Sequence, residues 1–112
     1  MDASKQVGGE SSGFSPLQLL LAALGGCTGI DIVDIMRKQR QQVDDLEIVV
    51  SGERVKEPPR VYNTIHVEYR VKGKDIKEKA VKRTIQLSED KYCSVGAMLR
   101  AKAKVTSKYI IQ

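Results

Sequence analysis

The sequence predicts an α+β fold in which one long apolar helix, buried at the centre, packs with a mixed or antiparallel sheet. Three observations predict it: an apolar run near the N-terminus, two central segments that alternate apolar and polar residues, and a helix-then-strand pattern after them. The resulting order of helix, strand, strand, helix, helix and strand is that of an α+β domain. We expect residues 1–112 to form a single domain, because a chain of this length buries one core.

The first predicted helix has a well-marked start. Residues 1–14 are rich in glycine and serine and are expected to be irregular or extended. Ser15 is then a candidate N-cap, Pro16 suits the first helical position, and Gln18 completes a capping box. The helix that follows is apolar on every side, so it must be surrounded rather than lie on a surface. Three glycines either break it or let another backbone approach closely: Gly25, Gly26 and Gly29.

Two strands are predicted from period-two alternation, with residues 56–60 as the turn of an antiparallel pair. In the first strand, Leu46, Ile48 and Val50 share one face. In the second, five apolar residues face one way: Val61, Ile65, Val67, Tyr69 and Val71. Five others face the opposite way: Tyr62, Thr64, His66, Glu68 and Arg70.

The second half of the chain continues with two helices and a strand. Asp75 can cap a helix with Glu78 three residues on. Four residues at helical spacing then form its inner side: Ile76, Ala80, Thr84 and Leu87. A short helix is expected to start near Asp90 and to carry Cys93, and a strand over residues 104–111 closes the order.

Composition and charge favour some function classes over others. The net charge of +5 divides into −3 for residues 1–50 and +8 for residues 51–112, which is more typical of a solvated face than of a nucleic-acid site. The uncharged window from Leu17 to Ile30 is too short for a membrane span, and no targeting signal precedes it, so we expect a cytoplasmic protein without membrane contact. The single histidine, His66, is expected on a solvated strand face rather than as a base or ligand, and no metal-binding spacing is present.

The two cysteines, Cys27 and Cys93, are the candidate functional residues. Cys27 follows Gly25-Gly26, where another chain, helix or substrate could come close to the sulfur. If each cysteine lies at the start of a helical segment, the amide dipoles there favour the nucleophilic thiolate. The alternative is that both are small buried hydrophobic residues, since free cysteine is among the most buried residue types.

Two segments resemble the cysteine segments of the OsmC/Ohr superfamily, most closely its OsmC-like, YhfA-type branch: residues 13–36, GFSPLQLLLAALGGCTGIDIVDIM, and residues 86–99, QLSEDKYCSVGAML. The resemblance implies an intertwined homodimer around a buried central helix, and a thiol-dependent peroxidase acting on organic hydroperoxides. It implies that Cys27 attacks the peroxide and that Cys93 resolves the product to a disulfide. It implies no bound cofactor or metal, but an external dithiol as reductant.

Two departures from the family pattern support a second hypothesis. Leu17 occupies the position where active peroxidases carry a glutamate, and residues 1–14 contain no arginine, so we expect the domain to lack most of the family's N-terminal β-hairpin. The alternative function is therefore a non-enzymatic dimer of the same fold that serves as a redox sensor or binds a small apolar ligand.

Overall fold

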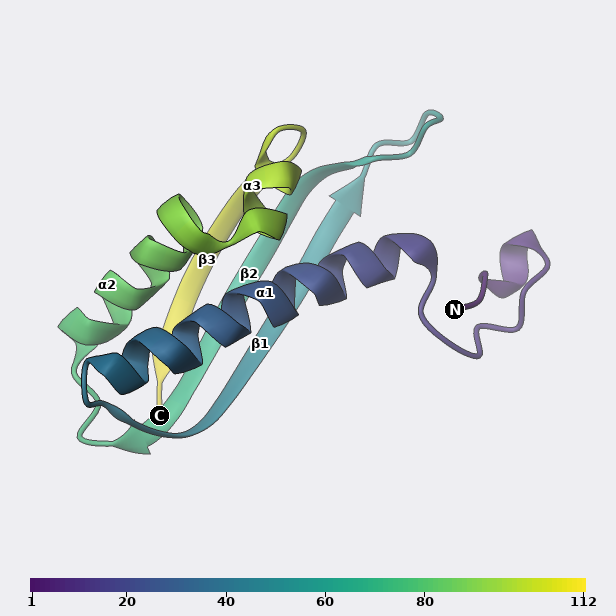
Figure 1. The fold of residues 1–112 in the computed structure, drawn as a ribbon. Helices are drawn as coiled ribbons and strands as arrows, with labels where there is room; N and C mark the ends of the chain where they lie inside the picture. The colour runs from purple at the N-terminus through teal and green to yellow at the C-terminus, as the bar shows by residue number, and fades with distance from the viewer.

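The computed structural model describes all 112 residues and has two layers, a three-stranded sheet with the helices on one of its faces (Figure 1). The α+β fold class predicted from the sequence is confirmed, as is the order of the main elements. In chain order these elements are the 3-10 helix η1 (Lys5–Val7), α1 (Pro16–Lys38), β1 (Gln42–Arg54), β2 (Tyr62–Lys74), α2 (Glu78–Leu87), the π-helix η2 (Ser88–Tyr92), α3 (Ser94–Arg100) and β3 (Lys104–Ile111).

The sheet has the order β1-β2-β3 and is mixed. β1 and β2 form the expected antiparallel pair, whereas β3 lies parallel to β2. Four of the five predicted inner residues are confirmed, because Ile65, Val67, Tyr69 and Val71 are each 1% exposed beneath the helices, whereas Val61 precedes β2 and is only partly buried. The prediction for Tyr62 is wrong: a register shift at the end of β1 lets its ring turn inward, and its hydroxyl donates to the carbonyl of Leu17 at 2.9 Å.

α1 begins as predicted and does not break. The Ser15 hydroxyl accepts from the Gln18 amide at 3.3 Å, and the Gln18 side chain accepts from the Ser15 amide at 2.9 Å. Two of the glycines allow β1 to lie close: a Cβ on Gly25 or on Gly29 would approach a side chain of β1 to 3.4 or 3.3 Å. The helix is continuous through these glycines, and Cys27 therefore lies in its interior rather than at the start of a new segment.

α1 is covered on only one side within this chain. Four of its residues are buried against the sheet and the other helices: Leu24, Thr28, Ile32 and Met36. Its outward side carries exposed apolar residues, among them Ile30 at 74% and Val33 at 51% exposure. The helix is long and apolar enough to cross a membrane by length and composition alone, with a mean hydropathy of 1.8 over 18 residues of which 22% are buried. The sequence predicted a helix surrounded on every side, whereas within the single chain the outward side of α1 is exposed.

The helices after the sheet start later than predicted. Lys77, rather than Asp75, is the N-cap of α2, because Asp75 has a left-handed conformation with φ 56°. The inner side of α2 is formed by Ala80, Val81, Thr84 and Ile85. Residues 88–92 then continue as the wider π turn of η2, so α3 begins only at Ser94. Cys93 consequently caps α3 instead of occupying its third position.

The residues before α1 form a closed loop rather than an extended lead-in. The Asp2 carboxylate accepts hydrogen bonds from the amides of Ala3, Glu10 and Ser12 and from the Ser12 hydroxyl, at 2.7 to 3.0 Å. These bonds lower the pKa of Asp2 to about 2. The loop lies beyond the N-terminal end of α1, away from the sheet (Figure 1).

Candidate functional site

The structure brings together the two cysteines that the sequence singled out. Cys27 on α1 and Cys93 at the start of α3 are both free thiols, and they lie close enough for each to shift the pKa of the other. The Ser94 hydroxyl lies 3.9 Å from the Cys27 sulfur. The two sulfurs therefore share one site, where α1 crosses the first turn of α3.

The Cys27 sulfur is surrounded by hydrogen-bond donors from the neighbouring helix. Partial burial raises the pKa of this thiol. The amides of Val95 and Ser94, the Ser94 hydroxyl and the Cys93 thiol lower it by a larger amount, so the pKa of Cys27 lies below its ordinary value. The donors belong to the first turn of α3, not to the start of α1. The sequence thus predicted a lowered pKa for Cys27 from the wrong helix.

The pKa of Cys93 is shifted in the opposite direction to that of Cys27. Burial, at 4% exposure, raises the pKa of Cys93 to about 11, and the nearby Cys27 and Asp31 raise it as well. One bond opposes them, because the Cys93 sulfur accepts from the Gly96 amide at 3.3 Å. The expectation of an easily ionised thiol is therefore wrong for Cys93. As the pH rises, Cys27 therefore loses its proton before Cys93 does.

A buried polar network next to the cysteines was missed by the sequence analysis. Thr28 on α1 lies 3.3 Å from the Tyr69 hydroxyl and 2.9 Å from the Ser88 hydroxyl. Ser88 in turn donates to the carboxylate of Asp31 at 2.8 Å. One signal could have found it: Thr28 and Asp31 interrupt an otherwise apolar helix, and Asp31 follows Cys27 by one helical turn.

A cation near Cys93 was also missed. A Cβ placed on Gly96 would lie 3.2 Å from Nη1 of Arg100 and 3.3 Å from the Cys93 sulfur, so glycine lets both groups approach. Arg100 donates through Nη1 to the carbonyl of Glu89 at 2.7 Å, which fixes its guanidinium across η2. Only the folding of η2 against α3 places this positive charge at the site.

The other residues considered from the sequence lie elsewhere or act differently. His66 points to the outer face of the sheet, where its Nδ1 pairs with the Thr106 hydroxyl at 2.8 Å. Leu17 packs against the core and supplies no carboxylate. The chain contains no group of three histidine, cysteine, aspartate or glutamate side chains close enough to hold a metal ion.

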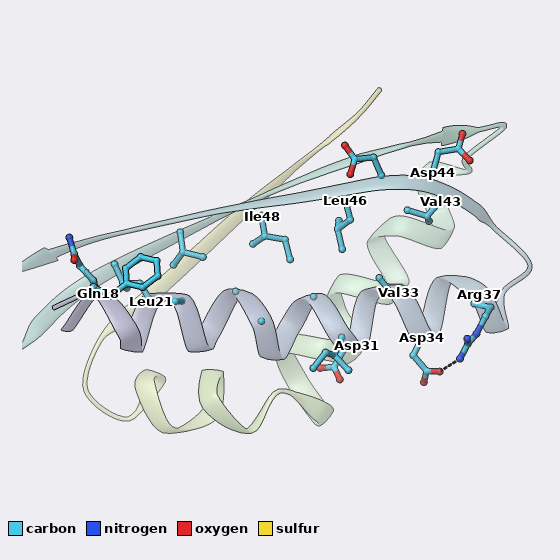
Figure 2. A pocket seen from close by; sticks show the side chains of 18 residues that line it. Gln18, Leu21, Asp31, Val33, Asp34, Arg37, Val43, Asp44, Leu46 and Ile48 are labelled. Carbon is cyan, nitrogen blue, oxygen red and sulfur yellow. Dashed lines mark hydrogen bonds and ion pairs between the residues drawn. The ribbon is translucent and has the colours of Figure 1, made fainter. Parts of the chain in front are cut away.

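A groove lies on the other side of α1, away from the cysteines. It occupies about 1330 Å³ between α1 and β1, and Figure 2 shows Leu21, Val33, Leu46 and Ile48 along it. Cys27 does not line this groove, because its side chain points toward α3 while Gly25 and Gly29 face β1. The groove opens along the exposed apolar side of α1, so it concerns what covers that helix rather than the chemistry of the sulfurs.

Comparison with known proteins identifies the family of this chain. The profile of the OsmC-like protein family matches residues 8–108, so the chain belongs to the OsmC-like family. It is 43% identical over 95 residues to Protein YhfA of Escherichia coli strain K12, covering 85% of this chain and 71% of that protein.

Solved structures agree with this assignment. A hypothetical protein from Aquifex aeolicus VF5 has a TM-score of 0.81 and 37% identity, covering 93% of this chain and 79% of that one. A Legionella pneumophila protein described as an organic hydroperoxide resistance protein OsmC and predicted redox protein has a TM-score of 0.74 at 14% identity, covering 97% and 78%. At that identity the second likeness shows the shared fold.

Proposed function

We propose that the protein is a cysteine-dependent organic hydroperoxide reductase. The Cys27 thiolate attacks the terminal peroxide oxygen, the O–O bond breaks, and the products are a sulfenic acid on Cys27 and an alkoxide that takes a proton to become an alcohol. Cys93 then condenses with the sulfenic acid to form a disulfide and water. An external dithiol reduces this disulfide by thiol–disulfide exchange and restores both thiols, so no bound cofactor is needed.

One observation carries this proposal: the pKa values of the two neighbouring thiols are shifted in opposite directions. A peroxide-reducing pair needs one sulfur that is a thiolate before the substrate arrives and a second that stays unreacted until the sulfenic acid forms. Hydrogen-bond donors lower the pKa of Cys27, whereas burial raises that of Cys93. The apolar residues of α1 around Cys27 favour an alkyl hydroperoxide over a charged substrate.

A redox sensor, or a small-ligand module of the same fold, is the second candidate. The groups that most lower the pKa of Cys27 are neutral hydrogen-bond donors rather than an arginine or lysine, and Leu17 supplies no carboxylate. A sensor needs a single oxidation event and no rapid turnover, which such neutral activation can support. The two candidates share the disulfide but differ in how often it forms.

We further propose that the functional unit is a homodimer in which a second copy covers the outward side of α1. Leu19, Leu20, Ile30 and Val33 are between 39% and 74% exposed, and 9 of the 18 residues that line the adjoining groove against β1 are hydrophobic. A soluble monomer rarely leaves so continuous an apolar side uncovered. Ile30→Glu is expected to shift the mass measured by light scattering from dimer to monomer, whereas Lys82→Glu on the polar side of α2 leaves it unchanged.

Turnover with a dithiol tests the enzymatic proposal directly. Purified protein is mixed with cumene hydroperoxide and dihydrolipoamide, and loss of peroxide is followed over many equivalents. We expect catalytic consumption that Cys27→Ser abolishes. In a parallel reaction without the dithiol, Cys93→Ser is expected to consume one equivalent and to accumulate the sulfenic acid. Formation of one disulfide per chain without further consumption of peroxide would reject the enzymatic proposal in favour of the redox sensor. No Cys27-dependent oxidation at all would reject both redox functions.

A further inference from the structure

Three buried hydroxyl groups and the partly exposed carboxylate of Asp31 form a hydrogen-bonded series with a single direction. Ser88 has one hydroxyl proton and donates it to the Asp31 carboxylate, so it can only accept from Thr28. Thr28 then has no proton left for Tyr69, and the phenol must donate to Thr28. Tyr69, Thr28 and Ser88 are at most 2% exposed, and burial raises the pKa of Tyr69 to about 12, so the phenol keeps its proton. Every donor in the chain is therefore aligned toward Asp31.

These hydrogen bonds hold a carboxylate, that of Asp31, beside both cysteines. Asp31 lies one helical turn after Cys27, on the same side of α1. Figure 2 shows its side chain turned away from β1. Ser88 joins Asp31 to the second cysteine as well, because the carbonyl of Ser88 accepts from the amide of Cys93 at 2.7 Å. The carboxylate is thus held in place from α1, from η2 and, through Thr28, from β2.

We propose that Asp31 takes up the proton that Cys93 loses when its sulfur attacks the sulfenic acid of Cys27, and returns that proton to the departing oxygen. This inference rests on the proposed function and adds a residue to its second step. The S–H bond of Cys93 and the S–O bond of Cys27 break, while the S–S bond and an O–H bond of water form. Cys93 supplies the electron pair of the new bond and is oxidised, Cys27 is reduced from sulfenic acid to disulfide, and the S–O pair leaves with oxygen.

The environment of Cys93 explains why this step needs help. A buried thiol with a pKa of about 11 is almost entirely protonated at neutral pH and attacks slowly by itself. A carboxylate that reaches the proton directly or through one water removes that barrier. Ser88 acts here as a positioning residue, since its hydroxyl holds Asp31 and its carbonyl holds the backbone of Cys93. These two hydrogen bonds of Ser88 keep the base, Asp31, and the nucleophile, Cys93, in one fixed arrangement.

Single-turnover kinetics of Asp31→Asn tests the proposal. One equivalent of cumene hydroperoxide is added to the reduced full chain at pH 7; sulfenic acid is trapped with dimedone, and disulfide is measured by loss of free thiols. The asparagine still accepts from Ser88, so the network is retained. We expect sulfenic acid to form within about threefold of the wild-type rate, and disulfide formation to slow about a hundredfold.

Two further variants separate proton transfer from charge or folding. Asp34→Asn removes the same charge three residues along α1, where Asp34 pairs with Arg37 and Lys38 on the surface, and is expected to keep the wild-type disulfide rate. Asp31→Glu retains a carboxylate and is expected to recover much of the lost rate. If Asp31 acted only through its charge, its removal would favour the Cys93 thiolate and accelerate the step.

The outcomes decide between these roles. A wild-type or faster disulfide rate in Asp31→Asn, with normal sulfenic acid formation, overturns the inference and leaves the proposed function intact. Equal slowing in Asp34→Asn also overturns it, because the effect would then be general to α1. Failure of the wild-type chain to form a sulfenic acid is a different result, since it rejects the proposed function itself.

Discussion

The two cysteines of this chain are adjacent in space yet differ in almost every property that governs a thiol. Cys27 lies in the interior of a 23-residue helix and is partly exposed, whereas Cys93 caps a helix of seven residues and is buried. The position of each sulfur in its own helix would make Cys93 the more easily ionised one. The pKa values show the reverse, since the pKa of Cys27 is lowered and that of Cys93 is raised. What points at a sulfur therefore matters more than where the residue stands in its helix.

The amides in the first turn of α3 act on both cysteines. Its Ser94 and Val95 amides are directed at the sulfur of the neighbouring helix, and the amide of Gly96 is directed at the cap itself. Burial outweighs that single bond at Cys93 but not the several bonds at Cys27. One short helix thus activates a cysteine on another element while leaving its own cap protonated.

The largest expected effect is on the relative reactivity of the two thiols. With limiting iodoacetamide at pH 8, Cys27 should be alkylated at least about a hundredfold faster than Cys93, because only the thiolate reacts. Peptide mapping by mass spectrometry measures both sites in the wild-type chain. The same experiment in urea is the control, where the two rates should agree within about threefold. Comparable rates in the folded chain would remove the distinction between the two cysteines.

Removal of the hydroxyl behind the pair should lower stability. Thr28→Val keeps the shape of the side chain but leaves the buried hydroxyl of Tyr69 without an acceptor and removes the donor to Ser88, which is expected to lower the free energy of unfolding by about 1–3 kcal/mol. The matched control is Thr106→Val on the outer face of the sheet, expected within about 0.5 kcal/mol of wild type. Urea denaturation measures both. Equal stabilities for the two variants would show that the buried network contributes little.

The raised pKa of Cys93 should appear as a pH dependence of stability. Above its ordinary value of 9.0, the unfolded chain loses the Cys93 proton while the folded chain retains it. The free energy of unfolding should therefore be fully present below pH 9 and fall as the pH rises toward the folded pKa. Urea denaturation at pH 8 and pH 10 compares Cys27→Ser with the variant that also carries Cys93→Ser. The single variant should lose more stability; parallel behaviour would mean that burial does not hold the proton on Cys93.

The smallest effect concerns one neutral donor at Cys27. Ser94→Ala removes the hydroxyl 3.9 Å from the Cys27 sulfur while the amides of Ser94 and Val95 remain. The pKa of Cys27 should rise slightly, and its alkylation at pH 7 should slow about twofold to fivefold. Ser51→Ala, on an exposed edge strand, serves as the control and should leave the rate unchanged. A loss as large as that expected from unfolding α3 would assign Ser94 a structural role instead.

Local sequence signals predicted the elements that depend on neighbouring residues. Ser15, Pro16 and Gln18 predicted the start of α1, because a capping box is completed within one helical turn. The alternation in residues 46–50 and 65–71 predicted which side of the sheet is buried, since side chains of a strand alternate between its faces. The predicted start near Asp90 failed because the π turn of η2 stems from packing against α1 and α3, which no local pattern records.

The sequence by itself determined the order of the elements, the capped start of α1, the alternating strands and the resemblance of the two cysteine segments to one family. These follow from residues close together along the chain, where spacing and propensity act directly. Only the tertiary structure decided that the thiols meet, that α3 activates the sulfur on α1, and that Asp31 is held beside them through Ser88. Such properties arise from groups separated by up to 67 residues, and a pKa or a proton path depends on the distances and burial that folding alone creates.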